Sequence, residues 1–153
     1  MSPDRLDIRI LSILQNDSSL TNLELANRIG LSAPACLKRV KKLKQQGFIK
    51  KQVCLLEPEK FGASLHIMVE IEMERDRPDQ YRSFVERALA CKEIKQCYQV
   101  TGKIDFILIV TVEDIPTYEK FCRRVLDKEP NLRKFRSLIC LHRHKFDTSL
   151  NIQ

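Results

Sequence analysis

The 153-residue sequence lacks the features that mark several protein classes. It has no apolar run as long as a membrane-spanning helix, and its first residues, Met-Ser-Pro-Asp-Arg, include no apolar signal-peptide segment. It has no Ser/His/Asp or Cys/His constellation, no pair of catalytic carboxylates and no glycine-rich phosphate loop. We therefore expect a cytoplasmic protein that is not an enzyme, makes no contact with a membrane and needs no cofactor.

The cysteines lack the spacing of a disulfide or zinc framework. The six are Cys36, Cys54, Cys91, Cys97, Cys122 and Cys140. No C-x-x-C pair occurs, and no histidine stands at ligand spacing from them. His142 and His144 alternate in an expected strand, but such a pair is more commonly solvated than metal-bound, so no metal site is assigned. Reduced thiols packed as small apolar side chains are expected.

Acidic residues are scarce in one part of the chain. The net charge is +7, from 27 Lys and Arg against 20 Asp and Glu. Residues 1–57 hold 10 basic and 5 acidic side chains, whereas residues 58–153 hold 17 and 15. The segment 38–51 carries seven basic residues and no acidic one. This local surplus favours a polyanionic partner.

Residues 24–32 predict two short helices joined by a tight turn. Leu25, Ala26 and Ile29 form the apolar side of the first helix. Gly30 can adopt the left-handed conformation that ends a helix, and Ser32 can cap the next one. A basic second helix after such a turn is typical of a helix-turn-helix, whose second helix enters the DNA major groove. The alternative is a plain helical hairpin with a solvated lysine face.

The first unit is predicted to contain three helices. The first spans 4–15, and the second begins at the capping box formed by Thr21 and Glu24. The third spans 33–46 and ends at Gly47.

The third helix should place one apolar stripe against the other two. This stripe is expected to contain Leu37, Val40 and Leu43, and Phe48 is expected to fold back onto the end of the helix. Its remaining surface would be basic.

If this helix binds double-stranded DNA, its first turns should contact bases and its lysines the phosphates. Base contacts are expected from Ser32, Ala33, Ala35, Lys38 and Arg39. Phosphate contacts are expected from Lys42, Lys50 and Lys51. Ser32 can equally be only a helix cap, and the two alanines only small residues that allow close approach.

The second half of the chain contains an internal repeat of 37 residues. Tyr81, Phe84, Val85, Ala88 and Leu89 recur as Tyr118, Phe121, Cys122, Val125 and Leu126. Ile67, Val69 and Ile71 recur as Ile104, Phe106 and Leu108. Each strand and helix is followed by another apolar run, at 94–100 and 135–141. The order β-α-β-β-α-β predicts a ferredoxin-like sheet with both helices on one face.

The predicted fold class is α+β, with a winged-type helix-turn-helix domain joined by an extended strand to a ferredoxin-like domain. The expected boundaries are 1–50, then 51–62 for strand and linker, then 63–153 for effector binding and oligomerisation. The runs 94–101 and 104–112 are apolar nearly throughout, which predicts strands buried on both faces. The uncovered sheet face, with Met68, Ile107 and Ile109, is expected to pair with another copy.

The order and spacing of several motifs resemble the leucine-responsive/asparagine-type (Lrp/AsnC, feast/famine) regulators over nearly the whole chain. The matching pieces are Asp7-x-x-Ile10-Leu11-x-x-Leu14-Gln15, Glu24-Leu25-Ala26, Gly30-Leu31-Ser32, Arg39-Val40-x-x-Leu43, Gly47-x-Ile49, Cys97-Tyr98-x-Val100-Thr101-Gly102-x-x-Asp105-Phe106 and Lys145-x-x-Thr148-x-Leu150. The resemblance implies a nucleoid-associated transcriptional regulator. It also implies a homodimer, assembling to an octamer, on a pseudo-palindromic DNA site.

The resemblance further implies an amino-acid effector bound beside the turn at Thr101-Gly102-Lys103. Backbone amides at such a turn can receive a carboxylate, and Asp105 can accept an ammonium group or pair with a neighbouring cation. The implied effector residues are Tyr98, Thr101, Gly102, Lys103, Asp105, Leu138 and Thr148. Two alternatives stay open: a metal- or thiol-redox-responsive regulator, and an amino-acid-binding regulatory domain of a metabolic enzyme.

Overall fold

The computed structural model describes residues 2–62 and 65–152, which form two compact units. The first unit contains the residues up to Leu55 together with those from Lys145 onward. The second unit runs from Leu56 to His144. The structure therefore groups the C-terminal segment with the helical unit, whereas the sequence-based boundaries group it with the sheet.

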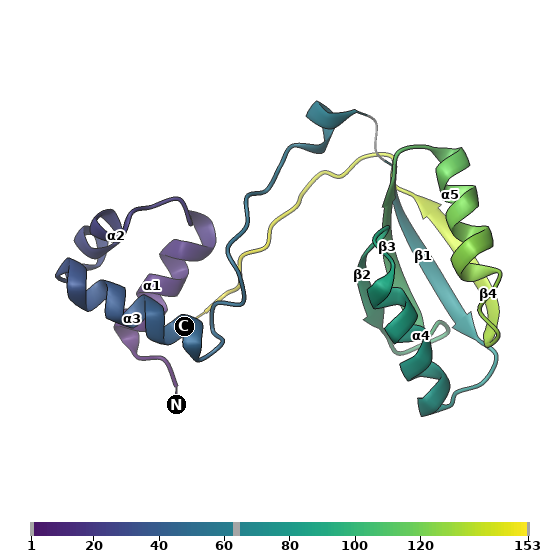
Figure 1. The fold of residues 1–153 in the computed structure, drawn as a ribbon, viewed down its shortest axis with the longest axis horizontal. Helices are drawn as coiled ribbons and strands as arrows, with labels where there is room; N and C mark the ends of the chain where they lie inside the picture. Colours follow the sequence, from purple (N-terminus) through teal and green to yellow (C-terminus); the bar gives the residue numbers. More distant parts are fainter. Residues whose placement is uncertain (1, 63–64, 153) are drawn as a thin grey trace. The chain divides into compact units, whose positions relative to one another are not determined.

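The first unit is built from three helices around a small core (Figure 1). They are α1 (Arg5–Asn16), α2 (Asn22–Ile29) and α3 (Ala33–Gln45). The capping box predicted before α2 is present, because the Thr21 side chain accepts from the Glu24 amide and the Glu24 carboxylate accepts from the Thr21 amide. Gly30 ends α2 with φ 77°, the left-handed conformation predicted for it.

Two details of α3 differ from the sequence-based prediction. Leu37 is 55% exposed and lies outside the core, whereas Cys36 is fully buried against Ile10, Leu25 and their neighbours. The residue types favoured leucine as the core residue, but the angle at which α3 lies against the other helices selects the preceding position. Ser32 holds the N-cap position, yet its side chain makes no capping hydrogen bond.

The end of α3 also differs in one residue. Gly47 adopts φ 79°, and the Phe48 amide donates to the Leu43 carbonyl at 3.0 Å, which closes the helix as predicted. Phe48 itself is exposed, and Ile49 packs against the core instead.

The predicted extended strand before the second unit is wrong. Residues 49–57 form neither helix nor strand, and η1 (Pro58–Phe61) is a short 3₁₀ helix. A strand needs a hydrogen-bonded neighbour, and none of the described strands of this chain pairs with this segment.

The second unit is a four-stranded antiparallel sheet whose two helices cover one face (Figure 1). Its elements are β1 (Leu65–Met73), α4 (Pro78–Ala90), β2 (Ile94–Gln99), β3 (Phe106–Val112), α5 (Ile115–Phe121), the π-helical turn η2 (Cys122–Leu126) and β4 (Leu132–Ile139). The strand order β2-β3-β1-β4 is that of the predicted ferredoxin-like arrangement.

The internal repeat is present in three dimensions, with one informative exception. Phe84 and Phe121 occupy equivalent buried positions on the two helices. Leu126 is fully buried, but its repeat partner Leu89 is 75% exposed. In η2 the Asp127 amide bonds the Cys122 carbonyl, five residues back. This wider turn rotates Leu126 into the core, a rotation that the regular helix α4 does not provide for Leu89.

The two apolar runs behave differently in the sheet. In β3 five of seven residues are buried, as predicted. In β2 none is, because β2 lies at the sheet edge and pairs only with β3. On the face away from the helices, Met68 of β1 pairs with Ile109 and with Leu138 of β4. Met68 and Leu138 are 37% and 42% exposed, so this face presents apolar side chains, as predicted.

Candidate functional site

The outer face of α3 is strongly basic. Its exposed residues are Pro34, Leu37, Lys38, Lys41, Lys42, Lys44 and Gln45. Four of these are lysines, and α3 contains no acidic residue. Ser32 is also exposed, and Ala33 and Ala35 are half-buried at the start of the helix. The structure thus brings the predicted base-contact residues together at one end of a basic helix.

Arg39 is occupied by contacts within the unit. Its guanidinium lies 2.6 Å from an Asp4 carboxylate oxygen and 2.7 Å from an Asp7 carboxylate oxygen. Asp7 is 6% exposed, and Asp4 caps α1 by accepting from the Leu6 and Asp7 amides. Arg39 therefore ties α3 to the start of α1, a role that the residue types alone did not suggest.

These ties have electrostatic consequences. The pKa of Asp4 is lowered, first by the hydrogen bond from the Asp7 amide and then by Arg39. The pKa of Arg39 is raised by its hydrogen bonds to Asp4 and Asp7. Both effects stabilise the charged forms and with them the position of α3.

The two lysines beyond α3, Lys50 and Lys51, are exposed in a segment without regular structure. They add positive charge after the end of the helix. The first unit also holds the C-terminal segment, because the Gln15 side-chain amide donates to the Leu150 carbonyl at 3.0 Å and accepts from the Leu150 amide at 2.8 Å. Thr148 lies in this segment.

In the second unit the predicted turn is present between β2 and β3. Gly102 has φ 119°, a conformation that L side chains rarely adopt, and the Val100 amide donates to the Asp105 carbonyl at 2.9 Å. Thr101, Gly102 and Lys103 are exposed. The turn thus offers unpacked backbone and one cation at the end of the sheet.

Asp105 already has two partners for its carboxylate. One oxygen accepts from the Met73 amide at 2.7 Å, and the other accepts from the Tyr81 hydroxyl. Burial, followed by the bond to Asp105, raises the pKa of Tyr81, so this phenol stays protonated and donates. Asp105 thereby joins the end of β1 and α4 to the turn through two contacts that the sequence did not predict.

Of the other implied effector residues in this unit, Tyr98 lies on β2, which leads into the turn, whereas Leu138 lies on β4. Tyr98 pairs with Ile107, and Leu138 pairs with Met68, so both lie on the open face of the sheet. They stand on the two edge strands, about 14 Å apart at the usual strand spacing. Leu138 is therefore separated from the turn by the width of the sheet.

A hollow of about 390 Å³ lies next to the Tyr81–Asp105 pair. Its lining residues are Asp76, Pro78, Tyr81, Arg82, Val85, Glu86 and Gln99. It combines a guanidinium, two carboxylates and an apolar wall. These residues were not predicted from the sequence, because only the apolar side of α4 entered the prediction. The available signal was the charged pair Arg82 and Glu86, which are four residues apart and therefore share a face of the helix.

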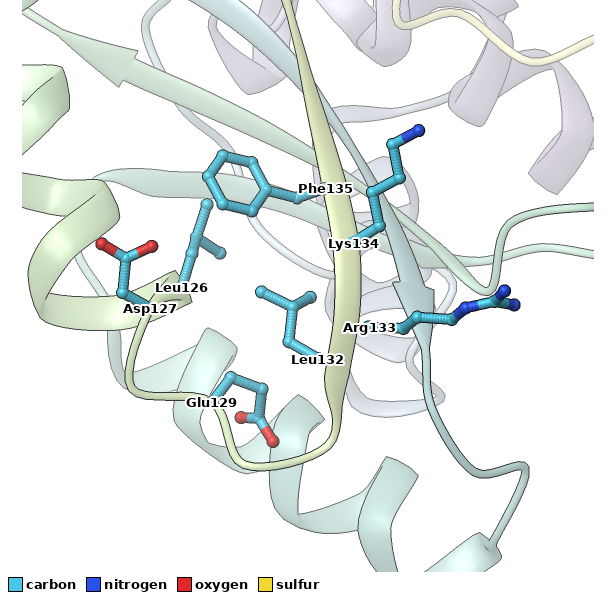
Figure 2. A pocket seen from close by; sticks show the side chains of 7 residues that line it. All are labelled: Leu126, Asp127, Glu129, Leu132, Arg133, Lys134 and Phe135. Atoms are coloured by element: carbon cyan, nitrogen blue, oxygen red, sulfur yellow. The ribbon is translucent and has the colours of Figure 1, made fainter.

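A second hollow of about 410 Å³ lies between the end of η2 and β4 (Figure 2). Leu126, Leu132 and Phe135 point into it, whereas Arg133 points away and pairs with Glu72 at 2.6 Å. Glu129, whose side chain is almost fully buried, accepts from Arg87 Nε at 3.1 Å. This hollow contains none of the predicted effector residues.

The cysteines bear on the redox and metal alternatives. Burial raises the pKa of the Cys36, Cys91, Cys97 and Cys122 thiols, which disfavours the reactive thiolate form. Within residues 2–62 and 65–152, no three Cys, His, Asp or Glu side chains are grouped so that they could hold a metal ion. No described helix combines the length and the hydropathy that crossing a bilayer requires.

A basic helix-turn-helix followed in the same chain by a ferredoxin-like unit defines a class of DNA-binding regulators, and comparisons with known proteins identify the family. A winged helix-turn-helix DNA-binding domain matches residues 3–50, and the Lrp/AsnC ligand binding domain matches residues 66–150. The chain belongs to the Lrp/AsnC family of DNA-binding transcriptional regulators.

Individual relatives agree over almost the whole chain. The leucine-responsive regulatory protein of Escherichia coli (strain K12) is 36% identical over 150 residues, which are 98% of this chain and 92% of that protein. An AsnC family regulator from Agrobacterium tumefaciens is 33% identical, with a TM-score of 0.88 over 96% of this chain and 95% of that one. A Neisseria meningitidis regulator, solved as a complex with L-Met, is 30% identical, with a TM-score of 0.89 over 97% and 96%.

Proposed function

We propose that this protein regulates transcription by binding specific double-stranded DNA through α3, and that an amino acid modulates this binding. The observation that carries the DNA part is the outer face of α3, with four exposed lysines and no acid. Ser32, Ala33, Ala35 and Lys38 would face the bases, and Lys42, Lys50 and Lys51 the phosphates. Arg39 would act by holding α3 on α1, given its ties to Asp4 and Asp7.

Salt dependence tests this proposal directly. Binding of the full chain to promoter fragments should weaken steeply as salt rises, because each neutralised phosphate releases counterions. Lys42→Ala should reduce the slope of log K against log salt by about 1. The matched control is Lys120→Ala on α5, which should leave the slope unchanged. Binding that is insensitive to salt, or equally reduced by both variants, would contradict the proposal.

The effector is proposed to be an α-amino acid held at the β2–β3 turn. The exposed amides of Gly102 and Lys103 suit its carboxylate, while the nearby hollow offers Arg82 or Glu86 to its charged groups. The L-Met complex of the Neisseria meningitidis relative supports this class of ligand. Asp105, with its two existing partners, would shape the turn more than it contacts the ligand.

A thermal-shift screen of the twenty amino acids tests the effector. A specific ligand at about 100 times its Kd should add about 2.7 kcal/mol to stability. Lys103→Ala and Arg82→Ala should then separate a site at the turn from one in the hollow. If none of the twenty raises the melting temperature, the amino-acid proposal fails.

Assembly is proposed to use the open face of the sheet. Met68, Tyr98 and Leu138 would be covered by the same face of a second copy, giving the two-fold symmetry that a pseudo-palindromic site needs. Tyr98 and Leu138 would then belong to this dimer contact, and dimers would associate further toward an octamer. Sedimentation of Met68→Asp against wild type tests the contact: a monomer is expected for the variant.

A further inference from the structure

Leu37 is the unexplained side chain on the outer face of α3. It is 55% exposed, although a leucine at this position was expected in the core. Among the exposed residues of α3 it is the one with a large aliphatic side chain; its neighbours on that face are lysines, a glutamine and Pro34. Lysine and glutamine support a helix about as well as leucine does, so helix formation does not require an aliphatic residue here.

The position of Leu37 places it where a recognition helix reads DNA. It is the fifth residue of α3 and immediately precedes Lys38, in the half of the helix that contacts base edges in a helix-turn-helix. The positive charge around it favours a polyanion over an apolar protein surface as the partner. The three small residues Ser32, Ala33 and Ala35 leave room for this end of α3 to approach a groove closely.

The other candidate reader on this half of the helix, Arg39, is already tied to Asp4 and Asp7. Both bonds come from Nη1 and hold the guanidinium at the start of α1, so we assign Arg39 to positioning α3 and look for base readout elsewhere on the helix. An apolar side chain can instead contact the C5 methyl group of thymine, which is the apolar group that the major groove exposes.

We propose that Leu37 is a specificity-determining residue that packs against a thymine methyl group in each half-site. This inference rests on the proposed DNA binding by α3. It predicts that the protein distinguishes thymine from uracil at one position of its site, a difference that phosphate contacts cannot produce.

The test first selects bound sequences from a random duplex library with wild-type protein. Each thymine of the selected site is then replaced singly by deoxyuridine, which keeps the base pair and removes only the methyl group. At one position per half-site, wild type should lose about fourfold in affinity, the equivalent of burying one methyl at about 0.8 kcal/mol. Leu37→Ala should lose this sensitivity, whereas Leu37→Met should keep it.

The remaining outcomes separate the inference from the function on which it rests. Leu37→Ala should keep the wild-type salt slope and melting temperature, because its lysines and its core are intact. If every replacement affects wild type and Leu37→Ala equally, Leu37 does not read a methyl and the inference is wrong. If Leu37→Ala changes the sedimentation coefficient, Leu37 belongs to a contact between copies and the inference is also wrong. If wild type selects no sequence at all, the proposed function fails and the inference fails with it.

Discussion

The helical unit and the sheet unit are held together in different ways. Among the described residues, the helical unit buries a cluster of six apolar side chains, whereas the sheet unit buries twelve. The helical unit compensates with polar ties at its helix ends: Arg39 to Asp4 and Asp7, and Gln15 to Leu150. Ion pairs occur in the sheet unit as well, such as Arg87–Glu129 and Arg133–Glu72, so the difference between the units lies in the amount of apolar burial.

This difference also affects where function can reside. In the helical unit the ties lie on the inner side of α3, and the lysines of the outer side are left to solvent. In the sheet unit the acidic residue expected to bind a ligand, Asp105, is itself a tie between the turn, β1 and Tyr81. A charged residue at a motif position can thus have partners within the chain in either unit, as Arg39 and Asp105 do.

The largest effect is expected from the sheet core. Leu126→Ala should cost about 2–5 kcal/mol of unfolding free energy, because the side chain is fully buried. Its repeat partner provides the matched control: Leu89→Ala, at a site 75% exposed, should stay within about 0.5 kcal/mol. Urea unfolding measures both. Equal losses would mean that the π-helical turn does not distinguish the two positions.

The second-largest effect is expected from Arg39→Ala, which should destabilise the helical unit. It leaves the Asp7 carboxylate, 6% exposed, without its cation, and a loss of about 1–3 kcal/mol is expected. Asp7→Asn in the same chain should recover part of that loss, because the uncompensated charge is gone. Thermal unfolding followed by DNA titration separates the roles. Unchanged stability with abolished binding would instead make Arg39 a base contact.

Tyr81→Phe tests the hydrogen bond between Tyr81 and Asp105 in the sheet unit. The variant keeps the ring contact with Phe106, whose centroid lies 5.1 Å away, and loses only the hydrogen bond to Asp105. A loss of about 0.5–1.5 kcal/mol in urea unfolding is expected. Tyr98→Phe, exposed on the open face, is the control and should change less. If Tyr81→Phe is neutral, Asp105 is available to a ligand.

The smallest effect is expected on the stability of the helical unit at acid pH. Because the folded-state pKa of Asp4 is depressed, its contribution is present above the ordinary value of 3.8 and is lost as pH falls through the depressed value. Asparagine caps a helix equally well but carries no charge. The stability of Asp4→Asn should therefore fall less than that of wild type in this acid range, by circular dichroism of the helical signal. If the stability of wild type and of Asp4→Asn fell in parallel with pH, the charge on Asp4 would make no contribution to stability.

Much of the fold was predictable because local signals were strong. Helix ends are encoded within a few neighbouring residues, as at the capping box of Thr21 and at the left-handed glycines Gly30 and Gly47. The 37-residue repeat is visible because the same apolar pattern occurs twice. The exposed basic face of α3 was predictable for the same reason, since the sequence of a helix shows which residues share a face. The surroundings of the implied effector residues were not predictable in this way, because Asp105 is bonded to Met73 and Tyr81 whereas Tyr98 and Leu138 lie on the open face of the sheet.

The amino-acid sequence by itself determined the element order, the basic character of α3 and the family, because these depend on residue types at short spacing. Tertiary structure alone decided that Cys36 and not Leu37 enters the core, that Leu126 and not Leu89 is buried, and that Arg39 and Asp105 have partners within the chain. Those outcomes depend on the angle and distance between packed elements. Such geometry is fixed by contacts across many residues and leaves no mark at any single position.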